Sequence, residues 1–368
     1  MADILICSHA GDAHTEAVIS GLGALGESAV LWQPGDFPAE QAVSIAIGTK
    51  GADSHSVDVN GASFTLDRVK TVWRRRPRPP RLSPALDPRD REFAGDQARQ
   101  HIDGFFTTAA PDALWVNPPS VAAQDLNKPL QLRWALDAGL AIPPTLISNS
   151  PERIRRFFDA HGGDVIFKPY KGGLWAPEQG NGGVRVNFTT AVSREDLTDS
   201  EALAHCPGIF QARVEKAWEL RVTAIGGNLF CVRIDPPAGG ERPLDWRTTG
   251  IRLGLSRANL PDMVAERVRT LMTRAGMAFG CFDFIVTPQG EYCFIEVNQG
   301  GQFLWQEEHL PDLPLLDAMC RFLASGARDF HYAPAGRPLR FGDHEPASVA
   351  AARARAAARP TEVTIATA

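Results

Sequence analysis

A predicted β-hairpin constrains this chain more than any other feature, because it is apolar enough for a core and yet carries charge. Its sequence is CFDFIVTPQGEYCFIEVNQGG. The runs from Phe282 to Val286 and from Tyr292 to Val297 are rich in aromatic and β-branched residues, which favour strands. The Pro-Gln-Gly between them is typical of a turn.

Three polar residues of this hairpin point to a cation site. Side chains alternate along a strand, so Glu296 and Asn298 share one face, and the turn brings Asp283 opposite residues 295–296. Like charges directly opposite one another destabilise a sheet pair, so we expect a positive group between them. Two carboxylates and an amide are suitable ligands for Mg²⁺ with phosphate oxygens. The alternative is a different register that turns the acids towards water.

The composition is that of an ordinary soluble globular protein, with 44% hydrophobic and 22% charged residues. A length of 368 residues allows two or three domains, and the net charge of −5 does not favour nucleic-acid binding. The sequence shows neither a membrane-spanning apolar run nor the basic segment of a signal peptide. The six cysteines form no C-x-x-C pair and the histidines no zinc motif, so we expect a cytoplasmic protein without zinc.

The order of apolar segments indicates an α/β chain of several parts. Strand-like residues 3–7 and 29–32 flank a helix-like run at 14–25. A proline pair near residue 118 indicates a domain boundary, and the sequence becomes Ala- and Arg-rich in its last forty residues. We therefore expect one part that ends near residue 118 and a separate tail after about residue 330.

Two lysines are candidates for binding phosphate. Lys168 ends an apolar strand and precedes a glycine-rich stretch, whose backbone N–H groups can approach phosphates closely. The alternative for Lys168 is a strand-end lysine that extends into solvent. Lys128 lies at a predicted helix start, where the helix dipole disfavours a positive charge unless an anion binds there.

The segment FQARVEKAWELRV contains candidates for binding the adenine, the ribose and the phosphates of a nucleotide. Gln211 and Val214 flank a stretch that could offer backbone groups to an adenine edge. Glu219 and Arg221 share a strand face; a carboxylate suits ribose hydroxyls and a guanidinium suits phosphate oxygens. The alternative for this pair is a mutual surface ion pair. Arg247, in a predicted loop, is a second candidate to face phosphate.

An arginine cluster, Arg74, Arg75 and Arg76, precedes a proline-rich stretch. It has three interpretations: a solvated loop, a nucleic-acid patch and a site for an acidic peptide. The negative net charge and the lack of interleaved aromatic residues disfavour nucleic acid. We favour the acidic peptide.

In this order the residues resemble the ATP-grasp ligases, with two lysines, a hinge-like QARV, the acid of WELRV and D-x12-E-x-N. The segments VWRRRP, WVNPP, NKPLQL, FKP, ELRVTAIG, DWR, FDFIVTPQG and EVNQGGQFLW are similar to the microviridin and graspetide maturases of ribosomal peptides. The segment PGDFPAE resembles the actinobacterial branch. The resemblance covers about residues 1–325, and departs from the family where Asn298 is followed by Gln-Gly-Gly.

The resemblance implies an α/β (α+β) ATP-grasp fold. Residues 1–118 would form the pre-ATP-grasp domain, 119–207 the central subdomain, 208–328 the C-terminal subdomain and 329–368 a low-complexity tail. ATP would be clamped between the central and C-terminal domains.

The resemblance also implies roles for the residues above. Mg²⁺ would be bound by Asp283, Glu296 and Asn298. The ATP phosphates would be neutralised by Lys128 and Lys168, and the nucleoside would be bound by Gln211, Val214 and Glu219. The transferring phosphoryl group would be stabilised by Arg221 and Arg247.

The implied substrate is a precursor peptide with a leader and a core that contains Thr, Ser or Lys together with Asp or Glu. Arg74 to Arg76 would bind acidic peptide, and Glu195 and Asp196 a basic leader residue. The product would be a side-chain ester or amide macrocycle, and the enzyme a cytoplasmic homodimer. One alternative is an ATP-grasp ligase for a free amino acid or a peptide C-terminus. Another is a peptide-binding module without catalysis.

Overall fold

The computed structural model describes residues 3–48, 53–170, 173–175, 185–187, 189–236, 244, 254–347 and 349–350. The chain is mixed α/β and divides into two compact units. The first unit comprises Met1–Pro119 with Gln302–Ala368, and the second comprises Ser120–Gly301. The expected domain boundaries, which differ from this division, stay a prediction.

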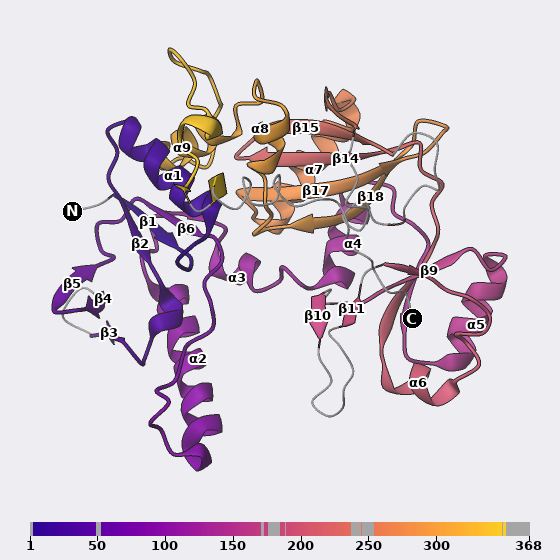
Figure 1. The fold of residues 1–368 in the computed structure, drawn as a ribbon, viewed down its shortest axis with the longest axis horizontal. Coiled ribbons are helices and arrows are strands. Elements are labelled where there is room, and N and C mark those ends of the chain that lie inside the picture. Colours follow the sequence, from indigo (N-terminus) through magenta and orange to yellow (C-terminus); the bar gives the residue numbers. More distant parts are fainter. Residues whose placement is uncertain are drawn as a thin grey trace. The chain divides into compact units, whose positions relative to one another are not determined.

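The first unit contains a parallel sheet with the strand order β2-β1-β6-β7 (Figure 1). Its strands are β1 (Ile4–Cys7), β2 (Ala29–Trp32), β6 (Thr71–Arg74) and β7 (Leu114–Val116). Both neighbours of β1 run parallel to it, and Ile4 is paired with Ala29 on one side and Thr71 on the other. The expected α/β opening of the chain is therefore confirmed.

The first unit includes the helices α1 (Ala13–Ala24), α2 (Arg91–Thr108), α8 (Trp305–His309) and α9 (Leu315–Ser325), and α3 (Pro119–Ala122) begins at the end of its first segment. Asp12 caps α1, because its Oδ1 accepts hydrogen bonds from the backbone N–H groups of His14 and Thr15. Helix α9 packs closely on α1 at Gly21, where a Cβ atom would lie 2.8 Å from Sγ of Cys320.

An antiparallel three-stranded sheet also belongs to this unit. It is formed by β3 (Gln41–Ala46), β4 (Ser54–Val59) and β5 (Ala62–Thr65). Val43 and Val57 of this sheet join the core around Trp32. The turn between β4 and β5 is made by Asn60 and Gly61, both with positive φ, which is the arrangement of a tight hairpin.

Part of the expected tail is anchored on α9. The buried carboxylate of Asp317 accepts hydrogen bonds from Arg321, from the hydroxyl of Tyr332 and from the backbone N–H of Leu339. The Ala- and Arg-rich residues 351–368 lie outside the described part of the chain.

The second unit contains a four-stranded sheet and a five-stranded sheet. The four-stranded sheet is the smaller one and is antiparallel, with the order β12-β9-β13-β8. Its strands are β8 (Thr145–Ser148), β9 (Val165–Lys168), β12 (Thr190–Ala191) and β13 (Gly208–Ala212). Helices α5 (Pro151–Ala160) and α6 (Ser200–His205) accompany it, and Ile154, Phe158 and Phe210 form its core. A separate ladder pairs β10 (Gly173–Trp175) with β11 (Arg185–Asn187).

The larger sheet is antiparallel with the order β16-β15-β14-β17-β18. Its strands are β14 (Trp218–Ile225), β15 (Asn228–Asp235), β16 (Gly254–Ala258), β17 (Phe279–Val286) and β18 (Tyr292–Asn298). The predicted hairpin is β17-β18, and its expected register is confirmed, since Asp283 is paired with Glu296. Phe284 is paired with Phe294, so Ile295 is the extra residue of a β-bulge.

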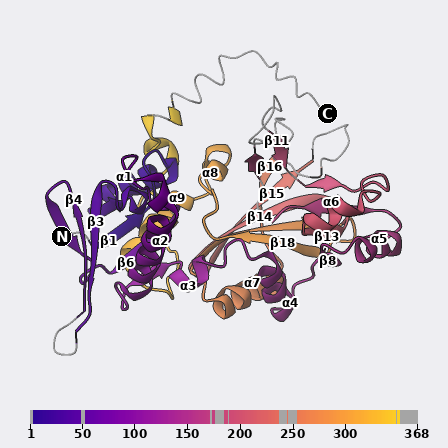
Figure 2. The same ribbon diagram turned by 90° about the horizontal axis from the view of Figure 1, so that it is seen from below.

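Helices α4 (Lys128–Asp137) and α7 (Asp262–Ala275) lie side by side against this sheet (Figure 2). They bury one of its faces, which includes Val222, Phe282 and Phe294. Because side chains alternate along a strand, Arg221 and Asp283 project from the opposite face. In the part of the chain that the structure describes, no helix is both long and apolar enough to cross a membrane.

The buried Glu307 in α8 should make the stability of the protein depend on pH. Its carboxylate accepts hydrogen bonds from the backbone N–H groups of Leu316 and Phe341, both at 2.8 Å. Burial raises the pKa of Glu307 to about 7, although the two N–H groups act in the opposite direction. Since an unfolded Glu has a pKa near 4.3, the folded state binds more protons between about pH 4 and pH 7.

The free energy of unfolding should therefore fall as the pH rises through this range, by at most about 3 kcal/mol. Urea unfolding at about pH 5 and about pH 8 measures it. Glu307→Gln should remove this part of the pH dependence, whereas Glu308→Gln, at the exposed neighbouring residue, should leave it intact. An unchanged pH dependence in Glu307→Gln would contradict the assignment.

Candidate active site

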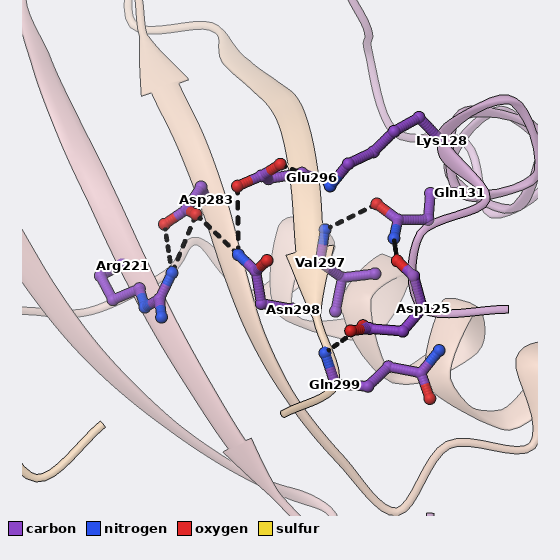
Figure 3. A network of polar contacts seen from close by, with 9 residues as sticks. All are labelled: Asp125, Lys128, Gln131, Arg221, Asp283, Glu296, Val297, Asn298 and Gln299. Atoms are coloured by element: carbon purple, nitrogen blue, oxygen red, sulfur yellow. Dashed lines mark hydrogen bonds and ion pairs between the residues drawn. The ribbon is translucent and has the colours of Figure 1, made fainter. Parts of the chain in front are cut away.

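The three polar residues of the hairpin converge on the face of the large sheet that the helices leave uncovered (Figure 3). Nδ2 of Asn298 donates hydrogen bonds to Oδ2 of Asp283 at 3.3 Å and to Oε1 of Glu296 at 3.1 Å. The alternative of a different register that turns the acids towards water is wrong, since Asp283 is paired with Glu296 and both meet Asn298. Their role as metal ligands stays a prediction.

Each carboxylate is bound to a cation from a different element. Nη1 of Arg221 in β14 lies 2.8 Å from both oxygens of Asp283, its cross-strand partner. Nζ of Lys128, the first residue of α4, lies 2.6 Å from Oε2 of Glu296. Burial alone would lower the pKa of Arg221, but the carboxylate of Asp283 outweighs it and raises that pKa above its usual value. Arg221 is therefore charged at neutral pH.

The donor set fits a hard divalent cation. Asp283 and Glu296 supply carboxylate oxygens, and a half-turn of the Asn298 amide would place its Oδ1 where Nδ2 now meets both of them. Mg²⁺ is typically bound by one or two carboxylates and completes its coordination with phosphate oxygens and water.

The chain leaves this site through a glycine that no other residue could replace without a shift. A Cβ atom on Gly301 would lie 2.7 Å from Sγ of Cys281 and 3.0 Å from the carbonyl oxygen of Asn298. This close approach gives a physical reason for the second glycine of the Gln-Gly-Gly step after Asn298.

Glu219 lies two residues before Arg221 on the same face, but the two bind different partners. Oε1 of Glu219 accepts a hydrogen bond from Nζ of Lys216 at 2.7 Å, and Arg221 binds Asp283. Both side chains are mostly buried, so the alternative of an exposed surface pair is wrong. Lys216 was not predicted, although it lies three residues before a candidate ribose ligand.

The smaller sheet places three further candidates. Gln211 is buried; its Nε2 donates to Oγ1 of Thr145 at 2.9 Å, whereas its Oε1 has no hydrogen-bond partner among the described residues. Val214 is half-buried in the connection between β13 and β14. Lys168 ends β9 and is half-buried rather than fully extended into solvent.

Lys168 is also electrostatically connected to the hairpin. Burial raises the pKa of the Cys293 thiol in β18 to about 11, and the positive charge of Lys168 opposes this shift. Arg247 and the glycine-rich residues 176–184 lie outside the described part of the chain.

The arginine cluster at the end of β6 is mostly not solvated. Arg75 is buried, and its Nε lies 3.6 Å from Oδ2 of Asp12, so the interpretation as a solvated loop is wrong for this residue. The guanidinium of Arg74 lies over the ring of Phe106, and Arg76 is exposed. Burial, followed by the charges of Arg75 and Arg76, lowers the pKa of the nearby His14 well below its usual value.

Glu195 and Asp196 lie in an exposed turn of the second unit. Oδ2 of Asp196 accepts hydrogen bonds from the backbone N–H and the hydroxyl of Ser193, at 2.8 and 2.7 Å. Asp196 therefore shapes the turn, which leaves Glu195 as the more available carboxylate. Binding of a leader peptide by these two residues stays a prediction.

Comparisons with known proteins identify the family of this chain. Residues 3–122 match the family model of the MvdD pre-ATP grasp domain. The macrocyclase MdnC of Microcystis aeruginosa MRC, solved with the precursor peptide MdnA, is 29% identical with a TM-score of 0.77, over 88% of this chain and 100% of that one. A search of curated protein sequences found no match.

Two further solved structures are similar over almost their whole length. A RiPP-associated ATP-grasp ligase of Chryseobacterium gregarium, in complex with ADP and a leader and core peptide, is 27% identical with a TM-score of 0.79, over 90% of this chain and 100% of that one. The macrocyclase MdnB of Microcystis aeruginosa MRC is 31% identical with a TM-score of 0.71, over 88% of this chain and 99% of that one. The expected fold is thereby confirmed, and this chain belongs to the microviridin- and graspetide-type ATP-grasp macrocyclases.

Proposed function

We propose that this chain is an ATP-dependent ligase that closes side-chain macrocycles in a ribosomal precursor peptide. The observation that carries the proposal is the convergence of Asp283, Glu296 and Asn298, with Lys128 and Arg221 beside them. Family membership supports the same activity, because relatives were solved with a precursor peptide or with ADP and a peptide.

The residues of the second unit suit Mg²⁺ and ATP. Asp283, Glu296 and Asn298 would hold Mg²⁺, which neutralises phosphate charge when it is bound. Lys128 and Lys168 would bind phosphate oxygens.

The nucleoside would be bound by residues on both sheets. Glu219 would accept hydrogen bonds from the ribose hydroxyls. The buried Oε1 of Gln211 needs a donor, and the exocyclic amine of adenine is one. Val214 lies in the same stretch and would offer its backbone.

The proposed reaction has two steps. In the first, an Asp or Glu side chain of the peptide attacks the γ-phosphorus of ATP, which yields an acyl phosphate and ADP. In the second, a Ser or Thr hydroxyl or a Lys amine attacks the acyl carbon, loses its proton and releases phosphate. Arg221 and Arg247 would stabilise the charge on the transferring phosphoryl group. Each ring lowers the mass of the peptide by one water.

Asp283→Asn and Glu296→Gln should each lower the rate of ATP-dependent water loss more than about a hundredfold, because each removes a ligand charge. Mass spectrometry of a Thr-, Asp- and Glu-rich precursor peptide with ATP and Mg²⁺ measures this, and peptide affinity should persist. Asp262→Asn, in an exposed position at the start of α7, is the matched control. Full activity of both site variants would exclude the metal assignment.

For the peptide we propose a site at the carboxyl ends of β1 and β6. In the sheet order β2-β1-β6-β7, β2 is added on one side of β1, whereas β6 and β7 are added on the other side. The strand order therefore reverses between β1 and β6, and ligands of open α/β sheets bind at such a point. Arg75 and Arg76 follow β6 there, and their charges act on the buried His14. Of the three arginines, the exposed Arg76 is the best placed to meet an acidic peptide, and Arg74 and Arg75 would add to the positive potential. Glu195 and Asp196 would meet a basic leader residue.

Arg76→Glu should weaken binding of an acidic precursor peptide by roughly tenfold at low salt, because it reverses one exposed charge. The loss should shrink at high ionic strength, where the interaction is screened. Fluorescence anisotropy with a labelled peptide measures both effects. Arg89→Glu, a charge reversal at an exposed arginine of the same unit, should bind normally. Equal affinities of the two variants would discard the Arg76 site.

The alternative activity is ligation of a free amino acid or of a peptide C-terminus. It would raise the mass of the substrate by one amino-acid residue, which is the amino acid less one water, whereas ring closure lowers the mass by one water, so the same mass measurement separates the two. The homodimer and the cytoplasmic location stay predictions.

A further inference from the structure

The metal-site strand β18 is the edge strand of the larger sheet, so its outward backbone N–H groups have no neighbouring strand. Two of these groups, and that of Gln299 directly after the strand, nevertheless donate hydrogen bonds, and every acceptor lies within residues 125–141. The N–H of Phe294 binds the carbonyl of Ala141 at 2.8 Å. Those of Val297 and Gln299 bind side chains of the same segment.

Those two side chains belong to Gln131 and Asp125 (Figure 3). Oε1 of Gln131 accepts from the N–H of Val297 at 3.2 Å, and Oδ1 of Asp125 accepts from that of Gln299 at 2.8 Å. The donors follow one another from residue 294 to residue 299, whereas their acceptors follow in the reverse order, from residue 141 to residue 125. Ala141 itself forms an isolated parallel bridge with Cys293, and the other two acceptors are side chains. The segment around α4 therefore covers this edge of the sheet without forming a strand of its own.

Gln131 and Asp125 also bind one another. Nε2 of Gln131 donates to the backbone carbonyl of Asp125 at 2.6 Å, so both ends of this amide are used. Gln131 is only 1% exposed, although it lies on a helix among leucines. A buried amide is tolerated when its hydrogen bonds are made, and here they join the segment before α4 to β18.

We call Asp125 and Gln131 the clamp, because their side chains hold the backbone of Gln299 and Val297. The two held residues alternate with the proposed metal ligands. Val297 lies between Glu296 and Asn298, and Gln299 follows Asn298, so neither ligand can shift along the strand without breaking a clamp bond. Helix α4, which contains Gln131, begins with Lys128, and Nζ of Lys128 binds Glu296. The two clamp residues thus fix the ligands relative to the lysine.

We propose that Asp125 and Gln131 are positioning residues that set the affinity of this site for Mg²⁺ with nucleotide. This inference rests on the proposed function. Groups that hold metal ligands in place typically change metal affinity by about 10- to 100-fold when they are removed. Neither residue touches the ion or the nucleotide in this proposal.

The test compares Asp125→Ala and Gln131→Met with the wild-type chain. Titration of Mg²⁺ in the presence of a non-hydrolysable ATP analogue should show about tenfold weaker binding in each variant. Hydrogen exchange without ligand should become faster at the amide of Gln299 in the first and of Val297 in the second. Asp125→Asn keeps the acceptor oxygen and should restore both properties to near wild-type values.

Val268→Ala is the control for a general loss of stability, because Val268 is a fully buried core residue of α7 outside the clamp. It should lower Tm without changing Mg²⁺ affinity. Wild-type Mg²⁺ affinity in Asp125→Ala and Gln131→Met, or a loss in Asp125→Asn as large as in Asp125→Ala, would overturn the inference alone. A wild-type chain that fails to bind Mg²⁺ with the analogue would overturn the proposed function as well.

Discussion

The site depends on the compensation of two negative charges, those of Asp283 and Glu296, which are paired across the β17-β18 ladder. Two carboxylates in directly opposed positions would destabilise the hairpin without nearby cations. Arg221 supplies one from the neighbouring strand and Lys128 the other from a helix start, at 2.8 and 2.6 Å. The register of β14 and the position of α4 are thereby tied to the chemistry of the site, because a displacement of either would leave a carboxylate without its cation.

The β-bulge at Ile295 allows one strand to serve the core and the site together. A regular strand would put Phe294 and Glu296 on the same face. The extra residue lets Phe294 and Val297 join the core beneath the helices, while Glu296 and Asn298 face Asp283. Bulges are frequent beside active sites, where they redirect side chains in this manner.

The hairpin could be predicted because its signals are local, and its pairing was predicted to within one residue. The partner of Asp283 could not, since Arg221 lies 62 residues away along the chain and only the assembled sheet joins them. The small sheet β3-β4-β5 was not predicted, although Asn60-Gly61 is a strong turn signal between its strands. The clamp of Asp125 and Gln131 had no signal in spacing, because side chains that replace a missing strand follow no period.

Lys128 has a contact in the structure that bears on its proposed role in phosphate binding. Its ammonium is bound to Glu296, and in the proposed function its movement towards a phosphate would be favoured by another positive charge that compensates this carboxylate. Arg221 stands in the same relation to Asp283. Binding of a divalent cation and release of these two side chains towards phosphate should therefore favour one another. Since Asp125, Gln131 and Ala141 fix the segment of α4 along β18, the proposed movement would be made by the side chain of Lys128 and not by the helix.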